Sequence, residues 1–403
     1  MTVSCWLDQP YTPRPSLSQR LSADAAVIGA GMTGVALALY LHEAGLQVLL
    51  IDAHTVAGGA TGKNAGFITS GLGEHYSRSV RFWGREDAAA ISELHLKNHD
   101  IIAALIERHG LKCGYRRTGS MAVAVDSEEE EVLRSSHSLL RQDHFTHELL
   151  EADEVDRTVS GRGFCCGLFT PSDAHVDPVR LVRGLAQIAG SEGVQVFENS
   201  PIESLQRSGD RWVLGSQSGA VSAPLVFLAC NAWVPRLCPG IPLQAVRGQC
   251  LAICGSGVSL PGMPCLTNYG SEYWRGVPGG AIFGGMRRFE RGGEPGYGDR
   301  TTETVQTALQ EFCDHHFPEL VQATVTHRWS GVMAYTPDGL PLIGAVPGNK
   351  GMYVSAGYTG HGFGYAFLAA QWLTRLAVEG KDEIHRLCRI GRQMRPSPAL
   401  AEL

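Results

Sequence analysis

The chain has 403 residues, which is long for one hydrophobic core, so two closely associated domains are expected. Its formal charge of −6 argues against a nucleic-acid-binding protein, because such proteins need a basic face. No stretch is apolar over the thickness of a bilayer, and residues 1–10 lack the basic and apolar segments of a signal peptide. These features exclude a transmembrane segment and leave peripheral membrane contact open.

The cysteines favour a reducing compartment. There are 11 of them, they are scattered, and they form no paired CxxC set. An odd, unpatterned number predicts neither a disulfide framework nor a zinc site. The cytoplasm is therefore the expected location.

Residues 23–52 have the pattern of a βαβ unit. The short apolar runs Ala25–Ile28 and Val48–Ile51 are typical of buried parallel strands. Between them, apolar residues at helical spacing predict a helix that ends at Gly45. The first strand leads directly into the turn Gly29-Ala30-Gly31-Met32-Thr33-Gly34.

This turn predicts a dinucleotide site. Gly29 permits the tight turn, Gly31 lets the backbone approach a pyrophosphate, and Gly34 lets the helix pack closely on the strand. The start of the helix, at Met32 and Thr33, offers N–H groups and a positive dipole end to the phosphates. The alternative is a Gly-rich turn that binds nothing.

The residues that follow extend this site. Asp52 ends the second strand, about 20 residues after the glycines, where a carboxylate accepts hydrogen bonds from a ribose. Residues 58–66, GGATGKNAG, form a second Gly-rich loop that can bring N–H groups and Lys63 against a phosphate. A flexible surface loop is the alternative. These motifs do not distinguish NAD from FAD.

Helices and strands alternate through the middle of the chain. Arg85–His109 is predicted as a long amphipathic helix, and Ser127 with Glu130 as the capping box of another. Both are expected in an insertion outside the sheet, with the acidic run 128–131 on a solvated face. Asp177 is predicted to cap a helix that runs to about Gly193. Strands are predicted at 194–197, 211–215, 220–223 and 225–229, the second and third as a hairpin.

The remaining third contains a different kind of sheet. Strands predicted at 248–253, 272–275 and 281–284 alternate like an antiparallel sheet with one face in water. A helix is predicted over 302–316, stopped by Pro318. A strand at 352–355, a Gly-rich turn at 357–362 and a helix over about 363–378 complete the pattern.

Five stretches in this order resemble the flavin-dependent amine and amino-acid oxidases of the D-amino-acid-oxidase superfamily: the βαβ unit, GGATGKNAG, LACNAW, TPDGLPLIG and AGYTGHGFG. The resemblance covers nearly the whole chain, and the loop TGKNAG is most similar to gamma-glutamylputrescine oxidoreductase. It implies an α/β fold: a Rossmann-type FAD-binding domain with a parallel sheet, and a substrate domain with a mostly antiparallel sheet. The implied FAD-binding domain is residues 23–84, 165–234 and 325–390, and the substrate domain is residues 85–164 and 235–324.

The resemblance also implies where FAD binds. The three glycines of the first turn would contact the pyrophosphate, Asp52 the adenine ribose, and Val196 the adenine side. The start of the last helix would direct its dipole at the flavin pyrimidine edge. Further implied cofactor contacts are Thr61, Gly62, Lys63, Asn64, Cys230, Asn231, Gly331, Gly357, Gly360, His361 and Gly362.

Residues that hold a substrate carboxylate in the superfamily are missing. Glycine oxidase-like members have one arginine in the stretch that corresponds to residues 331–335 and another at the position of Gly360. Sarcosine oxidase-like members have a lysine near the position of Gly364 and an arginine near that of Gly66. A small α-amino acid held by these groups is therefore not favoured. Residues 331–333 also lack the cysteine that tethers flavin in sarcosine oxidases, so FAD is expected to be non-covalent.

Four residues are candidates for catalysis. Arg287 approximately matches the lysine that assists oxygen reduction in sarcosine oxidases; a surface arginine is the alternative. Arg275 is expected to reach a substrate carboxylate, or else to be a salt-bridged strand residue. Tyr358 and His361 are expected to border the substrate, although His361 is equally consistent with a hydrogen bond to flavin alone.

The implied activity is that of an FAD-dependent oxidoreductase that oxidises the C–N bond of an amine or amino acid. Hydride would leave the α-carbon for flavin, the imine would hydrolyse, and oxygen or another acceptor would reoxidise the flavin. One alternative is a 2-hydroxy acid dehydrogenase that acts on a C–O bond. Another is a flavin-binding protein without catalysis that acts through a partner.

Overall fold

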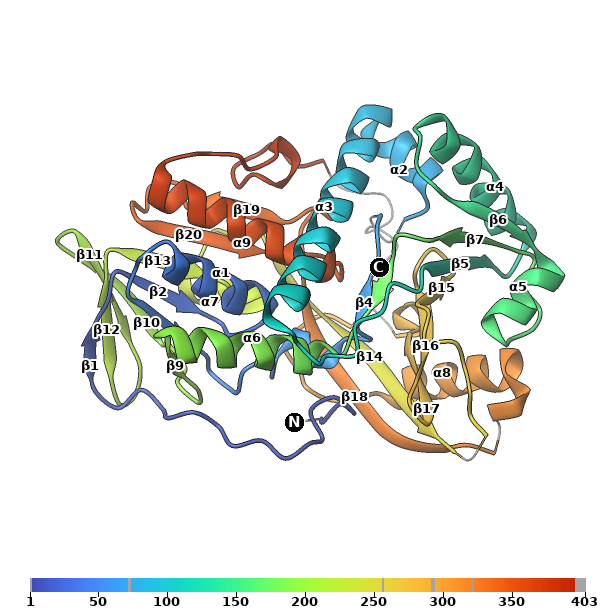
Figure 1. Ribbon diagram of the computed structural model, residues 1–403, viewed down its shortest axis with the longest axis horizontal. Helices are drawn as coiled ribbons and strands as arrows, with labels where there is room; N and C mark the ends of the chain where they lie inside the picture. The colour runs from blue at the N-terminus through green and yellow to red at the C-terminus, as the bar shows by residue number, and fades with distance from the viewer. Residues whose placement is uncertain (1, 72–73, 256, 291–293, 321, 396–403) are drawn as a thin grey trace.

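The computed structural model describes residues 2–71, 74–255, 257–290, 294–320 and 322–395. Two large sheets organise the described chain, a six-stranded sheet with helices packed on it and an eight-stranded sheet beside it (Figure 1). The chain passes between them repeatedly, so neither half is one continuous segment. This is the mixed α/β architecture that the sequence predicts.

The six-stranded sheet has the order β19-β20-β13-β2-β3-β9. Its parallel strands are β2 (Ala25–Ile28), β3 (Val48–Ile51), β9 (Gln195–Phe197), β13 (Leu225–Leu228) and β20 (Met352–Ala356), and β19 (Leu342–Ala345) pairs antiparallel at one edge. Alternate residues of β2 face opposite layers, Ala25 toward the helices and Ala26 toward a smaller sheet. Burial on both faces explains why β2 and β3 are apolar at every position.

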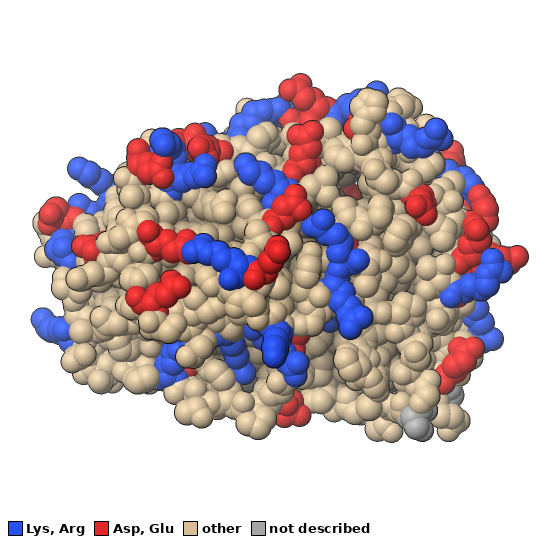
Figure 2. Space-filling model, in the orientation of Figure 1, with Lys and Arg blue, Asp and Glu red and all other residues tan. Residues whose placement is uncertain are grey.

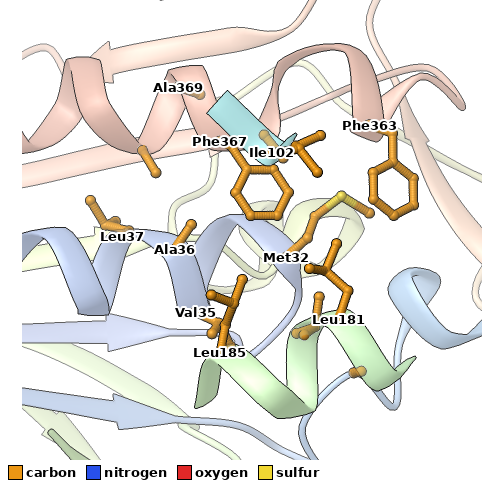
Figure 3. Close-up of a cluster of buried hydrophobic side chains, with 14 of the residues drawn as sticks. Met32, Val35, Ala36, Leu37, Ile102, Leu181, Leu185, Phe363, Phe367 and Ala369 are labelled. Atoms are coloured by element: carbon orange, nitrogen blue, oxygen red, sulfur yellow. The ribbon is translucent and has the colours of Figure 1, made fainter. Parts of the chain in front are cut away.

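Helix α1 (Met32–Glu43) is apolar on nearly all sides because other helices enclose it. It packs against α6 (Pro178–Glu192) and α9 (Gly362–Glu379). Figure 3 shows its side chains among those of the neighbouring helices: Met32, Val35, Ala36 and Leu37 with Leu181, Leu185, Phe363, Phe367, Ala369 and Ile102.

The long helix α3 (Arg85–His109) ends at Gly110 in the left-handed conformation, as predicted. It packs along α9, and Ile102 belongs to the same apolar cluster as α1 (Figure 1). Its place in an insertion stays a prediction, and its partner α9 was not predicted, because an amphipathic pattern gives the apolar face of a helix but not its partner.

Helix α4 (Ser127–Gln142) lies beside α2 (Tyr76–Trp83). The predicted capping box is wrong by one residue, because Asp126 is the N-cap and its carboxylate accepts a hydrogen bond from the Glu129 amide. Glu129 itself is only 1% exposed, so the acidic run is not wholly solvated.

The eight-stranded sheet has the order β18-β14-β17-β16-β15-β5-β7-β6. Its strands are β5 (Ser120–Ala124), β6 (Glu148–Glu151), β7 (Cys166–Thr170), β14 (Gln244–Cys254), β15 (Cys265–Thr267), β16 (Glu272–Val277), β17 (Gly280–Gly285) and β18 (Thr324–Tyr335). Helix α8 (Glu303–His316) covers one face with Leu309 and Phe312, packed near Phe283 and α5 (Ala152–Val159). The predicted wet face is therefore wrong. Strands β7 and β18 also belong to this sheet. The predicted bounds placed nearly all of their residues in the FAD-binding domain, in segments 165–234 and 325–390. The other domain bounds stay predictions.

Smaller elements complete the fold. A four-stranded sheet contains β1 (Arg20–Ser22), β12 (Ala220–Ala223), β11 (Arg211–Gly215) and β10 (Ser204–Ser208), and the predicted hairpin is its β11–β12 pair. The short strands β4 (Phe67–Ile68) and β8 (Ala174–His175) pair with each other, and α7 (Val234–Leu237) follows β13. Within the described residues, no helix is long and apolar enough to cross a membrane.

Candidate active site

A cavity of about 1080 Å³ is lined by residues from both large sheets. One part of its wall follows the carboxyl ends of parallel strands, with Gly29 after β2, Asp52 after β3 and Cys230 after β13. Ligands of open parallel α/β sheets bind at this edge. The opposite wall is the inner face of β14, β16, β17 and β18, so the fold brings the two halves together at one site.

The first glycine turn is as tight as the sequence predicts. Gly29 has φ +107°, and a Cβ there would lie 2.6 Å from the Ala229 carbonyl oxygen. A Cβ on Gly34 would lie 1.7 Å from the Gly29 carbonyl oxygen, so only glycine fits where α1 crosses the turn. Gly31, Met32 and Thr33 line the cavity, whereas Gly34 lies behind its described wall.

Asp52 lines the cavity next to this turn. Its carboxylate accepts hydrogen bonds from the amides of Ala30, at 2.6 Å, and His54, at 2.7 Å. These bonds fix the carboxylate at the end of β3, where it is positioned to receive a ribose hydroxyl.

The predicted contact at Val196 is not found. Val196 pairs with Leu50 inside the sheet and lies outside the described wall. Ser200, Pro201 and Ile202 line this end of the cavity instead, after the chain has left β9. The error has a simple cause: strand residues are held inside the sheet, and the connection beyond the strand reaches the ligand edge.

The second glycine loop folds into a short 3₁₀ turn, Ala60–Lys63. Thr61, Lys63 and Asn64 line the cavity as predicted, and Gly62 lies behind them. Thr61 Oγ1 accepts a hydrogen bond of 3.1 Å from the Met32 amide, which ties this loop to the start of α1. The Lys63 ammonium is 2.8 Å from the Asp299 carboxylate, so this loop is also anchored to the second half.

Strand β18 supplies the facing wall through its alternation. Gly331, Met333 and Tyr335 line the cavity, while Val332 and Ala334 face an apolar cluster on the other side. This is the period of two expected of a strand. Gly331 is therefore placed as predicted, with larger side chains beside it.

The turn between β20 and α9 forms the end of the cavity. Gly360, His361 and Gly362 line it, and so does Asn231. Gly357 lies behind the described wall, where its amide donates a 3.0 Å hydrogen bond to Asn231 Oδ1. The turn thus connects two of the predicted motifs.

His361 is the N-cap residue of α9 and lines the cavity. Its Nδ1 lies 2.9 Å from the Thr359 carbonyl oxygen. Because a carbonyl only accepts, Nδ1 must hold the proton, and burial lowers the pKa of His361 so that the ring is neutral. Nε2 is then a hydrogen-bond acceptor.

Tyr358 lines the cavity, as expected, but its hydroxyl is bonded to the first half. Its oxygen lies 2.9 Å from Thr33 Oγ1 and 2.6 Å from Ser355 Oγ, inside the first half. Burial raises the pKa of Tyr358 to about 12. The expected catalytic role is not supported, because the polar end of this side chain is already bonded to the core.

Arg275 lies away from the cavity, so the prediction that it reaches a substrate carboxylate is not supported. It is 3% exposed, lies outside the described wall, and donates a 3.1 Å hydrogen bond to the Val176 carbonyl oxygen. Its guanidinium lies over the ring of Trp6, 5.2 Å from the centroid. On the same face of β16, Tyr273 lines the cavity. Arg275, two positions further along the strand, is buried between elements.

Arg287 lines the cavity and meets a neutral partner. It donates a hydrogen bond to the Tyr335 hydroxyl and lies over that ring. Other cations of the wall have different partners: Lys63 lies 2.8 Å from Asp299, Arg78 lies 2.8 Å from Glu74, Arg288 is paired with Glu272, and Arg236 lies over the ring of Tyr297. The positive charge of Arg287 is therefore directed at the cavity beside Tyr335.

Several residues of the cavity wall were not predicted from the sequence. Tyr269, Tyr273, Tyr335, Met333 and Arg78 all line the cavity. For Met333 and Tyr335 the signal was present, since they alternate with apolar residues along one strand. For Tyr269, in the connection between β15 and β16, no local pattern indicated the role.

The cysteines are all free in the structure. Among the described residues, no group of His, Cys, Asp and Glu side chains could hold a metal ion. Location in the cytoplasm stays a prediction from the cysteine pattern.

The fold and the cavity are those of a dinucleotide-binding protein, with a glycine turn at the edge of a parallel sheet and a second sheet across the cavity. Residues 24–376 match the family model described as "DAO: FAD dependent oxidoreductase", and the chain belongs to this family. It is an FAD-dependent oxidoreductase.

Relatives cover most of the chain. Gamma-glutamylputrescine oxidoreductase of Escherichia coli is 26% identical over 376 residues, which are 91% of this chain and 86% of that protein. Glycine oxidase of Geobacillus kaustophilus is 25% identical over 84% of this chain and 88% of its own length. The crystal structure of glycine oxidase from that organism has a TM-score of 0.81 at 22% identity, and covers 93% of this chain and 100% of its own.

The cavity residues fit FAD. The volume lies at the upper end for ligand sites, as a molecule with two ring systems requires. The Ala30 and Met32 amides already donate to Asp52 and Thr61, so the amides of Gly31 and Thr33, which line the cavity, would donate to the pyrophosphate. Asp52 would accept from the ribose. At the other end of the cavity, the start of α9 would supply its positive dipole end to the flavin. Non-covalent attachment stays a prediction.

Proposed function

We propose that this protein oxidises the C–N bond of an amine or amino acid to an imine, which then hydrolyses. The family supports FAD as the cofactor, and the names of the relatives above include an amino-acid oxidase and an oxidoreductase of a polyamine derivative. When bound, FAD supplies the acceptor for the two electrons and the hydrogen that leave the C–N unit. Everything else required is position and charge, which the cavity wall supplies.

The observation that best supports this proposal is the charge of the wall where the two halves meet. Arg287 is positive there, its partner Tyr335 is neutral, and burial lowers the pKa of His361 so that it adds no second cation. A cation disfavours a second positive charge nearby, so the reacting amine binds best in its neutral form. The neutral form has the lone pair that assists loss of hydride from the α-carbon.

Arg287 has a second role in the proposal. A guanidinium at the cavity wall stabilises negative charge that develops on oxygen or another acceptor as it takes electrons. This role depends on a cation without a carboxylate partner, and Tyr335 is a neutral partner. The acceptor itself is not identified by the comparisons.

The test is anaerobic bleaching of the flavin absorbance with amines, N-methylated amines and amino acids, followed by readmission of air. Bleaching by one class identifies the substrate chemistry, and rapid recovery in air identifies an oxidase. If FAD-loaded protein stays oxidised with every amine and amino acid, the proposal is wrong.

One observation favours a second candidate, oxidation of a 2-hydroxy acid. His361 is neutral, lines the cavity, and has its proton on Nδ1, so Nε2 is available to accept a hydroxyl proton. Bleaching by hydroxy acids and not by amines would select this candidate.

A further inference from the structure

A second cavity of about 280 Å³, the side chamber, adjoins the active-site cavity. The two spaces meet at Thr69, Glu74, Leu266 and His361, which line both. From there the side chamber extends along α2 and α3 to the exposed residues of the connection after α4. Figure 2 shows a hollow in this part of the surface, where Figure 1 places α2, α3 and α4.

Hydroxyl groups of the chamber wall donate to a carboxylate behind the wall. Ser70 Oγ and Ser120 Oγ donate to Asp173 at 2.8 Å and 2.6 Å, and the Ser70 amide donates to it at 3.0 Å. Asp173 is 1% exposed. Each hydroxyl proton is committed to Asp173, so these oxygens offer lone pairs to anything inside the chamber.

The same pattern recurs at the other side of the chamber. His75 Nε2 lies 2.9 Å from the Glu129 carboxylate, and the Tyr76 hydroxyl donates to Asp143 at 2.7 Å. A carboxylate accepts, so Nε2 of His75 holds a proton. At this side both carboxylates have ionic partners, Glu129 in His75 and Asp143 in Arg85 at 2.6 Å, and the Tyr76 oxygen offers lone pairs to the chamber.

Apolar side chains form one part of the chamber wall, beside further serine, threonine and histidine residues that include His144 and His147. Ile91 and Leu96 of α3, Leu140 of α4, and Ala122 and Leu168 of the eight-stranded sheet belong to the apolar part. Among the described lining residues, Glu74 is the only one of the Asp, Glu, Lys and Arg type, and it is paired with Arg78. At about 30 Å³ per water, the volume equals about nine waters, which is enough for a short alkyl chain with a polar end.

We propose that the side chamber binds an alkylammonium tail of the substrate, while the amine to be oxidised lies in the active-site cavity beyond His361. Methylene groups would lie against the apolar residues, and the ammonium would donate to the wall oxygens in front of Asp173. The inference rests on the proposed function and narrows it to substrates with a second, protonated amine.

The environment of Asp173 supports this occupant. Burial raises the pKa of Asp173 to about 7, although its backbone and hydroxyl donors and the charge of Arg117 lower it. His99 Nδ1 lies 3.9 Å from the carboxylate, and burial lowers the pKa of His99 to about 4, so this ring adds no positive charge at neutral pH. An ammonium in the chamber would supply one. The positive charge of Arg287 in the main cavity makes the reverse orientation, with the ammonium there, less favourable.

The test compares cadaverine with n-pentylamine, which differ only in the terminal ammonium. Apparent Kd and limiting rate of anaerobic flavin bleaching are measured for each on FAD-loaded protein, and calorimetry gives binding without reliance on turnover. Native protein is expected to bind cadaverine at least about 10-fold more tightly than n-pentylamine, because a hydrogen bond to a charged group contributes that much free energy. Asp173→Asn, which keeps the shape and removes the charge, is expected to reduce the preference to below about 3-fold.

Two further variants complete the design. Ala122→Leu fills the chamber and is expected to remove the preference, whereas Asp314→Asn, an exposed change on α8 outside the chamber, is expected to keep it. Bleaching by both amines with equal affinity would overturn the chamber proposal and leave the proposed function intact. Equal slowing of both amines by Ala122→Leu would mean a passage instead of a binding site. No bleaching by any amine would overturn both proposals.

Discussion

Gly34→Ala is a sharp test of the dinucleotide turn. In an ordinary helix, alanine stabilises by up to about 1 kcal/mol over glycine. At Gly34 the new Cβ would lie 1.7 Å from the Gly29 carbonyl oxygen, and Cβ contacts below 3.0 Å essentially do not occur. The turn and α1 would have to separate by more than an ångström, although β2 is paired on both sides and α1 is enclosed by helices.

Overpacking of this kind costs about 1–3 kcal/mol, and more where backbone is on both sides. We expect Gly34→Ala to destabilise the folded, FAD-bound protein by about 3 kcal/mol. If all of this free energy were lost from FAD binding, the Kd for FAD would rise roughly 100-fold. FAD titration of the apoprotein and thermal unfolding measure this loss.

The matched control is Gly190→Ala on α6, where a Cβ has open space and a small rise in Tm is expected. A Gly34→Ala protein with native Tm and a Kd for FAD within about threefold of native would refute the steric argument.

Three other predictions follow from buried or cavity-lining groups. Asp173 has a folded pKa of about 7 against an ordinary 3.8, so the native state binds more protons than the unfolded chain between these values and its stability falls as pH rises through this window. The stability of Asp173→Asn relative to native should therefore rise by up to about 3 kcal/mol from pH 4.5 to pH 7.5 in urea unfolding, and an equal difference at both pH values would contradict this. Arg287→Met should slow recovery of the flavin absorbance in air by at least about 10-fold, whereas Arg275→Met should leave this rate near native; similar effects of the two would remove Arg287 from the acceptor site. Tyr358→Phe should lower the free energy of unfolding by about 1–2 kcal/mol, because Thr33 and Ser355 lose a partner, with little change in the limiting rate of flavin bleaching; a large loss of that rate would restore Tyr358 as a catalytic candidate.

Much of the site at the sheet edge could be predicted from local sequence. The apolar runs of β2 and β3 place Gly29 and Asp52 at strand ends, and parallel strands bring their carboxyl ends to one edge. The turn before α9 was found for the same reason, since glycines and a helix start lie in consecutive residues. These features depend on neighbours in the chain, so one sequence is enough to see them.

The errors concern residues whose partners are distant in sequence. Arg275 was expected in the cavity, but it donates to Val176 from another element. Glu129 was expected in solvent, but it accepts from His75 and from the amides of Asn268 and Tyr269. No local pattern contains the identity of a partner that lies more than 50 residues away.

The sequence by itself therefore determined the class of fold and the cofactor edge, whereas the order of the strands within each sheet came from the structure. Tertiary structure alone decided which side chains face the substrate: the second sheet closes over the first, and each polar group then faces either the cavity or a buried partner. The side chamber is the clearest example. Its hydroxyl groups are ordinary serines in the sequence, and only the position of Asp173 behind them makes them acceptors.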